Sequence, residues 1–289
     1  MPTDKRQRKK EGRQARLEQL RAEQARARRK RLVATVLVIA LVVGLAAAVF
    51  SRGGDDEDNV AAGDDTTTTT TAEGSTDGPP QGEPVPAGAK LDTWACPAAD
   101  GSSPRTDQFP SEPPPMCIDP AKTVVATLST TQGPIEITLD TKKTPQTANN
   151  YAVLSRYHYY DGTVITRIDD SIDIIQTGSP RTQTISDPGP GYNIKDEGTG
   201  FTYSEGDVVM ARSQGPDSGS AQYFIVTGPK AAALNAQGTY VTFGKITSGL
   251  DVAKKIAGLF EPCAPSAASC LGGAPSELVT IEKVEIEER

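Results

Sequence analysis

Histidine is almost absent from this 289-residue chain, in which His158 is the single example. A histidine-dependent catalytic triad is therefore excluded unless His158 takes part in it. Because His158 follows a predicted helix, we expect it to have a structural role. The single tryptophan, Trp94, lies beside Cys96. We expect Trp94 to pack a proline-rich segment against the folded domain.

Apolar residues are also scarce. Hydrophobic residues make up 36% of the chain, and 22 residues are proline. A chain of this length has room for one or two domains, but so few apolar residues indicate that much of it is not core. We expect one globular domain with accessory segments.

Charge is distributed unevenly. Residues 1–31 contain 13 Lys/Arg and four Asp/Glu, a net charge of +9, so the rest must carry −16 to give the total of −7. A basic segment of this kind is typical of a nucleic-acid-binding tail or of a membrane boundary. The uncharged run that follows favours the membrane, and we expect no nucleic-acid binding.

Residues 32–50 form an uncharged apolar run, LVATVLVIALVVGLAAAVF. As a helix it would span about 28 Å, close to the roughly 30 Å of the hydrocarbon layer. Basic residues precede it and acidic residues follow it, which predicts a cytoplasmic N-terminus and an extracytoplasmic remainder. A cleaved signal peptide is the alternative, but its apolar core is normally shorter.

Residues 51–90 have almost no large apolar side chain and include a run of six threonines. Such a segment cannot bury enough surface to become ordered, so we predict a disordered acidic, Thr- and Pro-rich linker. As a flexible coil it would span on the order of 35 Å.

Four cysteines lie on the proposed outer side: Cys96, Cys117, Cys263 and Cys270. Disulfides are permitted in that compartment. Zinc is the alternative, but no histidine lies near them and neither pair has the common two-residue spacing, so we expect no metal. Three pairings are open, and we favour Cys96 with Cys117 and Cys263 with Cys270. The first pair would close a loop of roughly 20 residues within a Cys/Pro-rich extension, residues 91–122.

Many short strands and two helices are predicted after residue 122. Alternation on either side of Gln132 and Gly133 indicates a hairpin, and Thr144 with Pro145 predicts the N-cap and first turn of a helix that ends near Tyr157. A second helix is expected at 250–257. Further strands are expected at 164–168, 172–176, 208–211, 222–227, 240–246 and 279–286. This pattern is typical of a barrel or sandwich.

Four segments occur in an order and at a spacing that resemble cyclophilins, in particular bacterial, actinobacterial-like members. They are YYDGTVITR (159–167), GPGYNIKDE (189–197), MARSQGPDSGSAQYFIV (210–226) and FGKITSGLDVAKKI (243–256). The resemblance covers residues 123–286. It implies a mainly β fold, a closed eight-stranded antiparallel barrel capped by two helices, here preceded by one transmembrane helix. It also implies a peptidyl-prolyl cis/trans isomerase without a cofactor.

The resemblance assigns site residues by position. Arg167 matches the family's catalytic arginine, and Gln176 matches the glutamine that holds substrate and arginine in register. The predicted substrate-binding residues are Ile174, Ala211, Arg212, Gln222, Phe224, Leu234 and Tyr240. Arg212 replaces the asparagine of many members.

The segment between Arg167 and Gln176, IDDSIDII, is one residue longer than usual and lacks the expected phenylalanine. Ile172 or Asp173 would take that place and would loosen the proline pocket. Its three aspartates could suggest calcium, but we expect a solvated loop. Ala233 and Tyr240 occupy positions where eukaryotic members carry tryptophan and histidine, so we expect weak cyclosporin binding.

Two functions follow from these observations. We expect an isomerase that accelerates X-Pro rotation in exported proteins at the outer side of the membrane. The alternative is a catalytically weak or inactive module that binds proline-containing segments, because the altered loop could have removed turnover.

Overall fold

The computed structural model describes residues 82–212, 215–263 and 271–289. The predicted basic segment 1–31, the membrane helix 32–50 and most of the linker 51–90 lie outside these residues and remain predictions. Within the described ranges, no helix is both long and apolar enough to cross a membrane.

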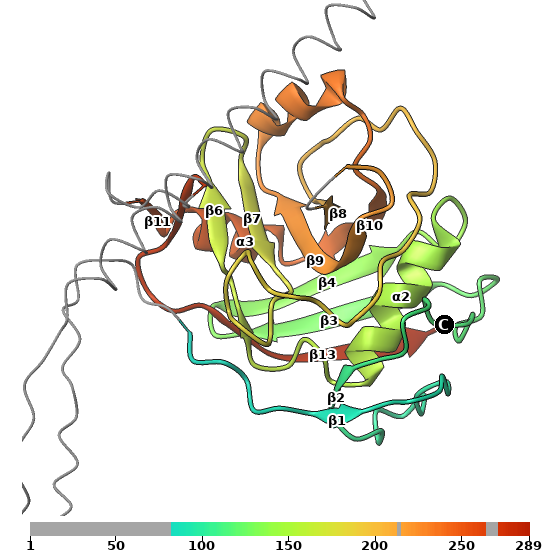
Figure 1. Cartoon of the computed structure of the whole chain (residues 1–289). Helices are drawn as coiled ribbons and strands as arrows, with labels where there is room; N and C mark the ends of the chain where they lie inside the picture. The colour runs from blue at the N-terminus through green and yellow to red at the C-terminus, as the bar shows by residue number, and fades with distance from the viewer. Residues whose placement is uncertain (1–81, 213–214, 264–270) are drawn as a thin grey trace, which may run out of the picture. The chain divides into compact units, whose positions relative to one another are not determined.

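Strands dominate the described domain (Figure 1). In this part of the chain one antiparallel sheet has eleven strands in the order β11-β12-β6-β7-β9-β8-β10-β4-β3-β13-β5, and β1 and β2 form a separate parallel pair. The strands are β1 Ala89–Lys90, β2 Thr106–Gln108, β3 Val124–Thr130, β4 Gly133–Leu139, β5 Thr163–Val164, β6 Arg167–Asp169, β7 Ile174–Thr177, β8 Asp207–Arg212, β9 Gly219–Val226, β10 Thr242–Ser248, β11 Phe260–Pro262, β12 Gly273–Pro275 and β13 Thr280–Glu288. The helices are α2 Pro145–Arg156, the 3-10 helix η1 Pro229–Ala236 and α3 Leu250–Ala257.

The sheet curls until its two sides meet along one segment of the chain. β5 pairs with β13 and β6 pairs with β7, and only Ile165 and Thr166 separate β5 from β6. The amide of Ile165 donates to the carbonyl of Val279 at 2.9 Å, and the amide of Thr166 donates to that of Gln176 at 2.9 Å. The predicted mainly β fold is thus confirmed, and its sheet is curled.

The strand count differs from the predicted eight for two reasons. The segment 163–169 changes partner midway and is divided into β5 and β6, and a hairpin of β11 and β12 extends the sheet beyond β6. Setting the hairpin aside leaves nine of the eleven described strands, which become eight when β5 and β6 are counted as one.

Helices α2 and α3 lie where the sequence predicts two helices, but the cap of α2 differs from the prediction. Thr144 occupies the N-cap position without a side-chain cap, and its hydroxyl donates to the carbonyl of Asp140 at 3.2 Å. The carboxylate of Glu197 accepts the amides of Gln146 and Thr147 at 3.0 and 2.6 Å instead. A side chain from a distant loop therefore satisfies the first turn.

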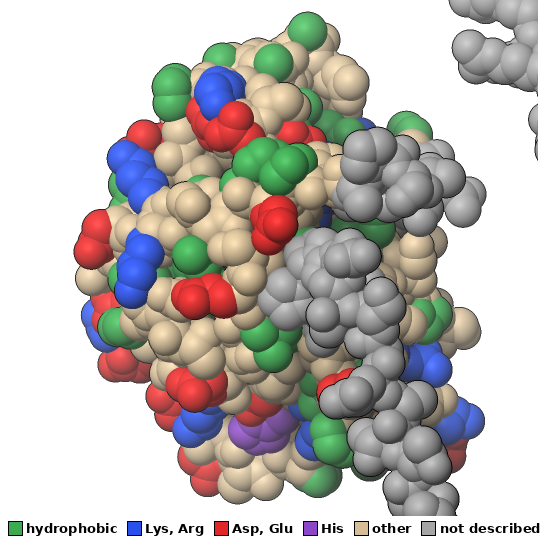
Figure 2. Space-filling model, turned by 90° about the vertical axis from the view of Figure 1, so that its left-hand side faces the viewer, with side chains coloured by type: hydrophobic (Ala, Val, Ile, Leu, Met, Phe, Trp, Pro, Cys, Tyr) green, Lys and Arg blue, Asp and Glu red, His purple; other side chains and the backbone are tan. Residues whose placement is uncertain are grey.

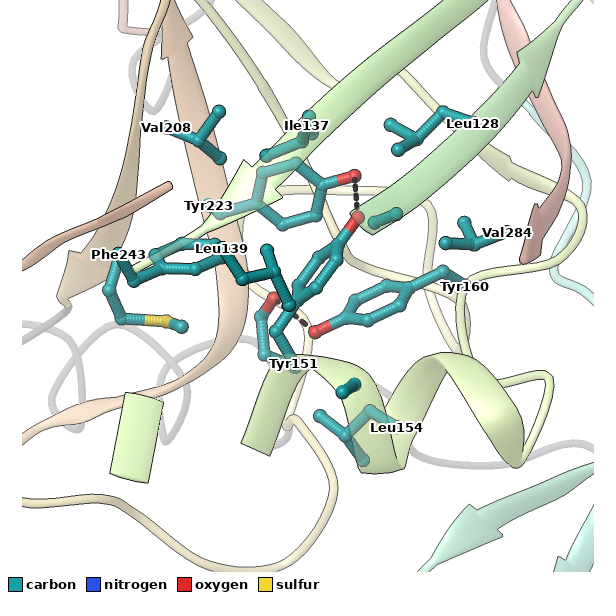
Figure 3. Packing of buried hydrophobic residues seen from close by; sticks show 14 of the residues in the cluster. Leu128, Ile137, Leu139, Tyr151, Leu154, Tyr160, Val208, Tyr223, Phe243 and Val284 are labelled. Carbon is teal, nitrogen blue, oxygen red and sulfur yellow. Dashed lines mark hydrogen bonds between the residues drawn. The ribbon is translucent and has the colours of Figure 1, made fainter. Parts of the chain in front are cut away.

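Tyrosine side chains fill the centre of the core. Tyr151 from α2, Tyr160 and Tyr223 from β9 point toward one another in Figure 3, and the hydroxyl of Tyr151 donates to that of Tyr223 at 3.4 Å. All three are fully buried, and Phe243 packs on Tyr151 with ring centroids 5.2 Å apart. Burial, reinforced by the neighbouring hydroxyls, raises the pKa of Tyr151 and Tyr160 well above 10.

The extension at 91–122 packs on this domain through its aromatic residues. Trp94 stacks on Phe109 with centroids 5.1 Å apart and meets the ring of Tyr192 edge-on at 5.5 Å, as predicted for Trp94. A disulfide joins Cys96 and Cys117, which confirms the first predicted pairing. The second pairing involves Cys270, which lies outside the described residues.

Polar contacts also hold the extension to the end of α2. The guanidinium of Arg105 donates to the carbonyls of His158 and Asp161 at 2.6 and 2.9 Å, and burial lowers the pKa of Arg105. The His158 ring contacts the Asp161 carboxylate and the Gly101 carbonyl at 2.8 and 2.9 Å. His158 therefore serves the attachment of the extension, in agreement with its predicted structural role.

Acidic and basic side chains are interspersed on the face of the domain drawn in Figure 2. Opposite charges that alternate in this way do not build a large field of one sign.

Candidate active site

Three neighbouring strands, β6, β7 and β9, carry the key predicted side chains in one row, which β8 continues. Arg167 lies opposite Gln176, Gln176 opposite Phe224, and Phe224 opposite Val209. Residues directly opposite one another on paired strands project from the same face of a sheet. The register alone therefore brings Arg167, Gln176 and Phe224 side by side.

The turn between β6 and β7 takes up the extra residue of the 168–175 segment. Asp169 pairs with Ile174, so residues 170–173 form the loop. Asp173 adopts a left-handed conformation with φ of 48°, which ends the loop and explains why β7 begins at Ile174 and not at residue 172 as predicted. The longer loop leaves the pairing of Arg167 with Gln176 intact.

A pocket of about 590 Å³ lies over this row. Both predicted catalytic residues and all seven predicted substrate-binding residues line it. The structure therefore brings together the whole predicted set, whose individual roles remain predictions.

One end of the pocket is apolar. Ile174 and Phe224 form its buried part, with Ile172, Leu234 from η1 and Tyr240 packed around them. The rings of Phe224 and Tyr240 meet edge-on with centroids 5.9 Å apart. Ile172 thus lines the pocket wall near the position where a phenylalanine was expected. This end of the pocket therefore stays aliphatic and aromatic.

The guanidinium of Arg167 is held by three groups of this chain. Its Nε donates to the carbonyl of Leu271 at 3.0 Å, its Nη1 donates to Oε1 of Gln176 at 3.0 Å, and its Nη2 pairs with Oδ2 of Asp169. Leu271 precedes β12, which pairs with β6 at Ile168. The added hairpin therefore contributes directly to the site.

Two glutamines continue this network along the floor of the pocket. Because arginine can only donate, Gln176 presents its oxygen to Arg167 and its nitrogen to Oε1 of Gln222, at 2.9 Å. Gln222 in turn donates to the carbonyl of Ile185 at 3.2 Å. The chain of bonds fixes the orientation of both side-chain amides.

Arg212 occupies the opposite wall. Its Nη1 bonds the carboxylate of Asp196 at 2.5 Å, its Nη2 donates to the hydroxyl of Thr239 at 2.7 Å, and its guanidinium lies 4.9 Å from the ring centre of Tyr240. The side chain is only 9% exposed. Arg212 therefore supports Tyr240 from behind, while Ala211 lines the pocket beside it.

The expectation of a solvated acidic loop is wrong for two of its three aspartates. Asp169 pairs with Arg167, and Asp173 accepts the backbone amide of Lys230 at 2.8 Å while its other oxygen lies 3.1 Å from the Lys230 ammonium. Asp170, which is exposed, lies 3.2 Å from the same ammonium. No cluster of metal-binding side chains occurs among the described residues.

Asp169 and Leu271 were not among the predicted site residues. Asp169 follows Arg167 by two positions, and residues two apart on a strand share a face, so its proximity could have been recognised. Leu271 carries no such signal, because its approach depends on the β11–β12 hairpin. The polar side of the pocket, lined by residues 185–188 with Asn193, Ser218 and Ser220, was also not predicted.

This arrangement places a permanently charged, planar donor group beside an apolar pocket. Such a site can hold an apolar ring and stabilise an electron pair that develops next to it.

The chain is similar to known proteins of one enzyme family. The family model described as cyclophilin type peptidyl-prolyl cis-trans isomerase/CLD matches residues 125–286. Peptidyl-prolyl cis-trans isomerase B of Bacillus subtilis is 36% identical over 124 residues, which cover 42% of this chain and 82% of that protein. A peptidyl-prolyl cis-trans isomerase of Acinetobacter baylyi is 34% identical over 134 residues, which cover 45% of this chain and 70% of that protein.

Among solved structures, a cyclophilin type peptidyl-prolyl cis-trans isomerase of Cryptosporidium parvum is 23% identical. The match has a TM-score of 0.47 and covers 58% of this chain and 99% of that one.

Proposed function

The chain belongs to the cyclophilin-type peptidyl-prolyl cis-trans isomerase family, and we propose that it accelerates X-Pro bond rotation in exported proteins at the outer side of a membrane. The observation that carries the catalytic part is the row of Arg167, Gln176 and Phe224 on paired strands beneath one pocket.

Rotation about an X-Pro bond requires no nucleophile. The barrier of roughly 18–20 kcal/mol arises from amide resonance, and an acceleration of about 10⁵ requires that roughly 7 kcal/mol be removed. The pocket end at Phe224 and Leu234 receives the proline ring. As the amide twists, the lone pair of its nitrogen is no longer delocalised into the carbonyl, and the free N–H groups of Arg167 stabilise this localised pair. Gln176 fixes Arg167 and the peptide backbone in position relative to each other.

Two features support the placement outside the membrane. The apolar run 32–50, with basic residues before it and acidic residues after it, predicts this orientation. The disulfide of Cys96 and Cys117 suits an oxidising compartment. The partners we propose are proline-containing segments of unfolded exported polypeptides.

The catalytic proposal is tested with the full-length chain in detergent and an Ala-Pro peptide. We expect Arg167→Ala to lower kcat/KM by about 100-fold, since it removes a donor that acts in the transition state. Arg289→Ala, at an exposed arginine, is the matched control and keeps the wild-type rate. Peptide binding without turnover in the wild type would instead favour the non-catalytic binding module.

The topological proposal is tested by adding protease to intact spheroplasts that express the chain. We expect the domain to be cleaved without lysis. Protection until the membrane is broken would show that the domain faces the cytoplasm.

Cyclosporin binding is expected to be weak. Ala233 on η1 offers no large ring, and Tyr240 is held against Phe224 and Arg212. Inhibition of isomerisation by cyclosporin at nanomolar concentration would contradict this expectation.

A further inference from the structure

Asp169 and Arg167 form an ion pair on one face of β6. They are two residues apart on the strand, so both side chains project toward the pocket side. The Arg167 side chain is 16% exposed and that of Asp169 11%, so water competes little for this contact.

Asp169 is itself held in a single orientation. Its Oδ1 accepts the amide of Ser171 at 3.0 Å and the hydroxyl of Ser171 at 2.5 Å. Its Oδ2 is therefore the oxygen that faces Arg167. The turn that follows β6 thus orients the carboxylate, and the carboxylate orients the guanidinium.

A guanidinium has five N–H donors. Leu271, Gln176 and Asp169 each accept one, from Nε, Nη1 and Nη2 respectively. The two remaining donors, one on Nη1 and one on Nη2, are left for the substrate. All three guanidinium nitrogens are hydrogen-bonded to the protein. The position and the orientation of the guanidinium plane are therefore fixed before the reaction begins.

We infer that Asp169 is a positioning residue that fixes the Arg167 guanidinium for its action on the prolyl nitrogen. This inference rests on the proposed function of Arg167. Asp169 does not line the pocket and acts through Arg167 alone.

Asp169→Asn tests the inference with little change in shape. The two donors of Ser171 keep the remaining oxygen on their side, so the new NH₂ group faces the donors of Arg167 and repels them. We expect kcat/KM for an Ala-Pro peptide to fall about tenfold, mainly through kcat, because loss of one charge-assisted hydrogen bond has about this effect.

Asp170→Asn is the matched control. It removes the same charge one residue away, from a side chain that is 65% exposed and pairs with Lys230. We expect its kcat/KM to stay within twofold of the wild type. An equal loss in both variants would show a general effect of charge on the loop and would contradict the inference.

A second comparison separates positioning from structural damage. In the Arg167→Ala background, Asp169→Asn is expected to cause no further loss, because its only route to the substrate has been removed. A tenfold loss that persists in this background would overturn the inference. A faster Asp169→Asn enzyme would also overturn it, because that result would mean that the carboxylate weakens the arginine.

An independent readout uses the Nε–H signal of Arg167 in NMR spectra of the full-length chain. We expect an ordered side chain in the wild type and in Asp170→Asn, and a mobile one in Asp169→Asn. This readout remains valid if the wild type shows no turnover, in which case the proposed function fails separately. Equal order in all three proteins would contradict the inference.

Discussion

At the scale of single residues, the pocket depends on side chains that act on one another and not only on a ligand. Arg212 illustrates this, because it contacts the back of Tyr240 while Tyr240 contacts Phe224. A residue predicted to bind substrate therefore also supports another residue of the wall.

Arg212→Lys is expected to weaken substrate binding. Lysine keeps the charge but cannot bond Asp196 and Thr239 with one planar group while it lies over Tyr240. We expect KM for an Ala-Pro peptide to rise about threefold to tenfold with kcat almost unchanged. Steady-state kinetics measure this, with Arg289→Lys as control. A fall in kcat at constant KM would show that Arg212 acts in the transition state.

Motifs located several of the pocket residues because these residues lie in segments of fixed local pattern. Phe224 and Gln222 lie in the run 210–226, and Arg167 closes the run 159–167. The hydrogen bond that fixes Arg167 to Leu271 was not predictable in the same way. Leu271 is 104 residues away in sequence, and only the fold brings its carbonyl to the guanidinium.

At the scale of elements, long alternating or helical patterns were predicted well and short irregular ones were not. The β3–β4 hairpin and α3 follow strong patterns. The helix η1 and the β11–β12 hairpin do not. In the hairpin, Pro262 interrupts any alternation, and β12 pairs with β6 only at Gly273 and Ile168.

Gly272→Ala is expected to displace this hairpin from β6. A Cβ there would lie 2.7 Å from the carbonyl oxygen of Ile168 and 3.1 Å from the Cα of Asp169, and φ is +77°. Since Leu271 would move with it, we expect kcat/KM to fall about threefold to tenfold.

Gly101→Ala is the control for backbone strain. Its φ is +73°, yet a Cβ there meets nothing within 4 Å. We expect this variant to lose about 1 kcal/mol of unfolding free energy and no activity. If both variants behaved alike in the isomerase assay, contact of the hairpin with β6 would be irrelevant to catalysis.

At the scale of the whole molecule, the disulfide and the aromatic contacts attach the extension 91–122 to the curled sheet. Replacing both Cys96 and Cys117 with serine opens the loop that the disulfide closes between two residues 21 positions apart. We expect a loss of about 3 kcal/mol and a fall in Tm of roughly 6–12 °C. Calorimetry measures this fall in Tm. An unchanged Tm would show that the aromatic contacts of Trp94 and Phe109 are enough to attach the extension without the disulfide.

The tyrosine core predicts a loss of stability in alkali. Burial raises the pKa of Tyr151 and Tyr160 in the folded domain above 10, whereas the unfolded chain ionises near 10. Their contribution is therefore complete below about pH 10 and is lost as the pH rises from there toward the folded pKa. Denaturant titrations at about pH 9 and about pH 11 measure this, and at about pH 11 the tyrosinate absorbance is expected to rise further as unfolding exposes Tyr151 and Tyr160. Equal stability at both values would contradict the prediction.

The pairing of Arg167 with Gln176 also has a consequence for recognising relatives of this chain. Backbone hydrogen bonds across β6 and β7 set which residues face each other, and the loop 170–173 absorbs a change in length. A search pattern that fixes the number of residues between the arginine and the glutamine would reject this sequence, although the two side chains bond at 3.0 Å. A criterion based on which residues pair across β6 and β7 would retain this sequence, because it does not depend on the number of residues between them.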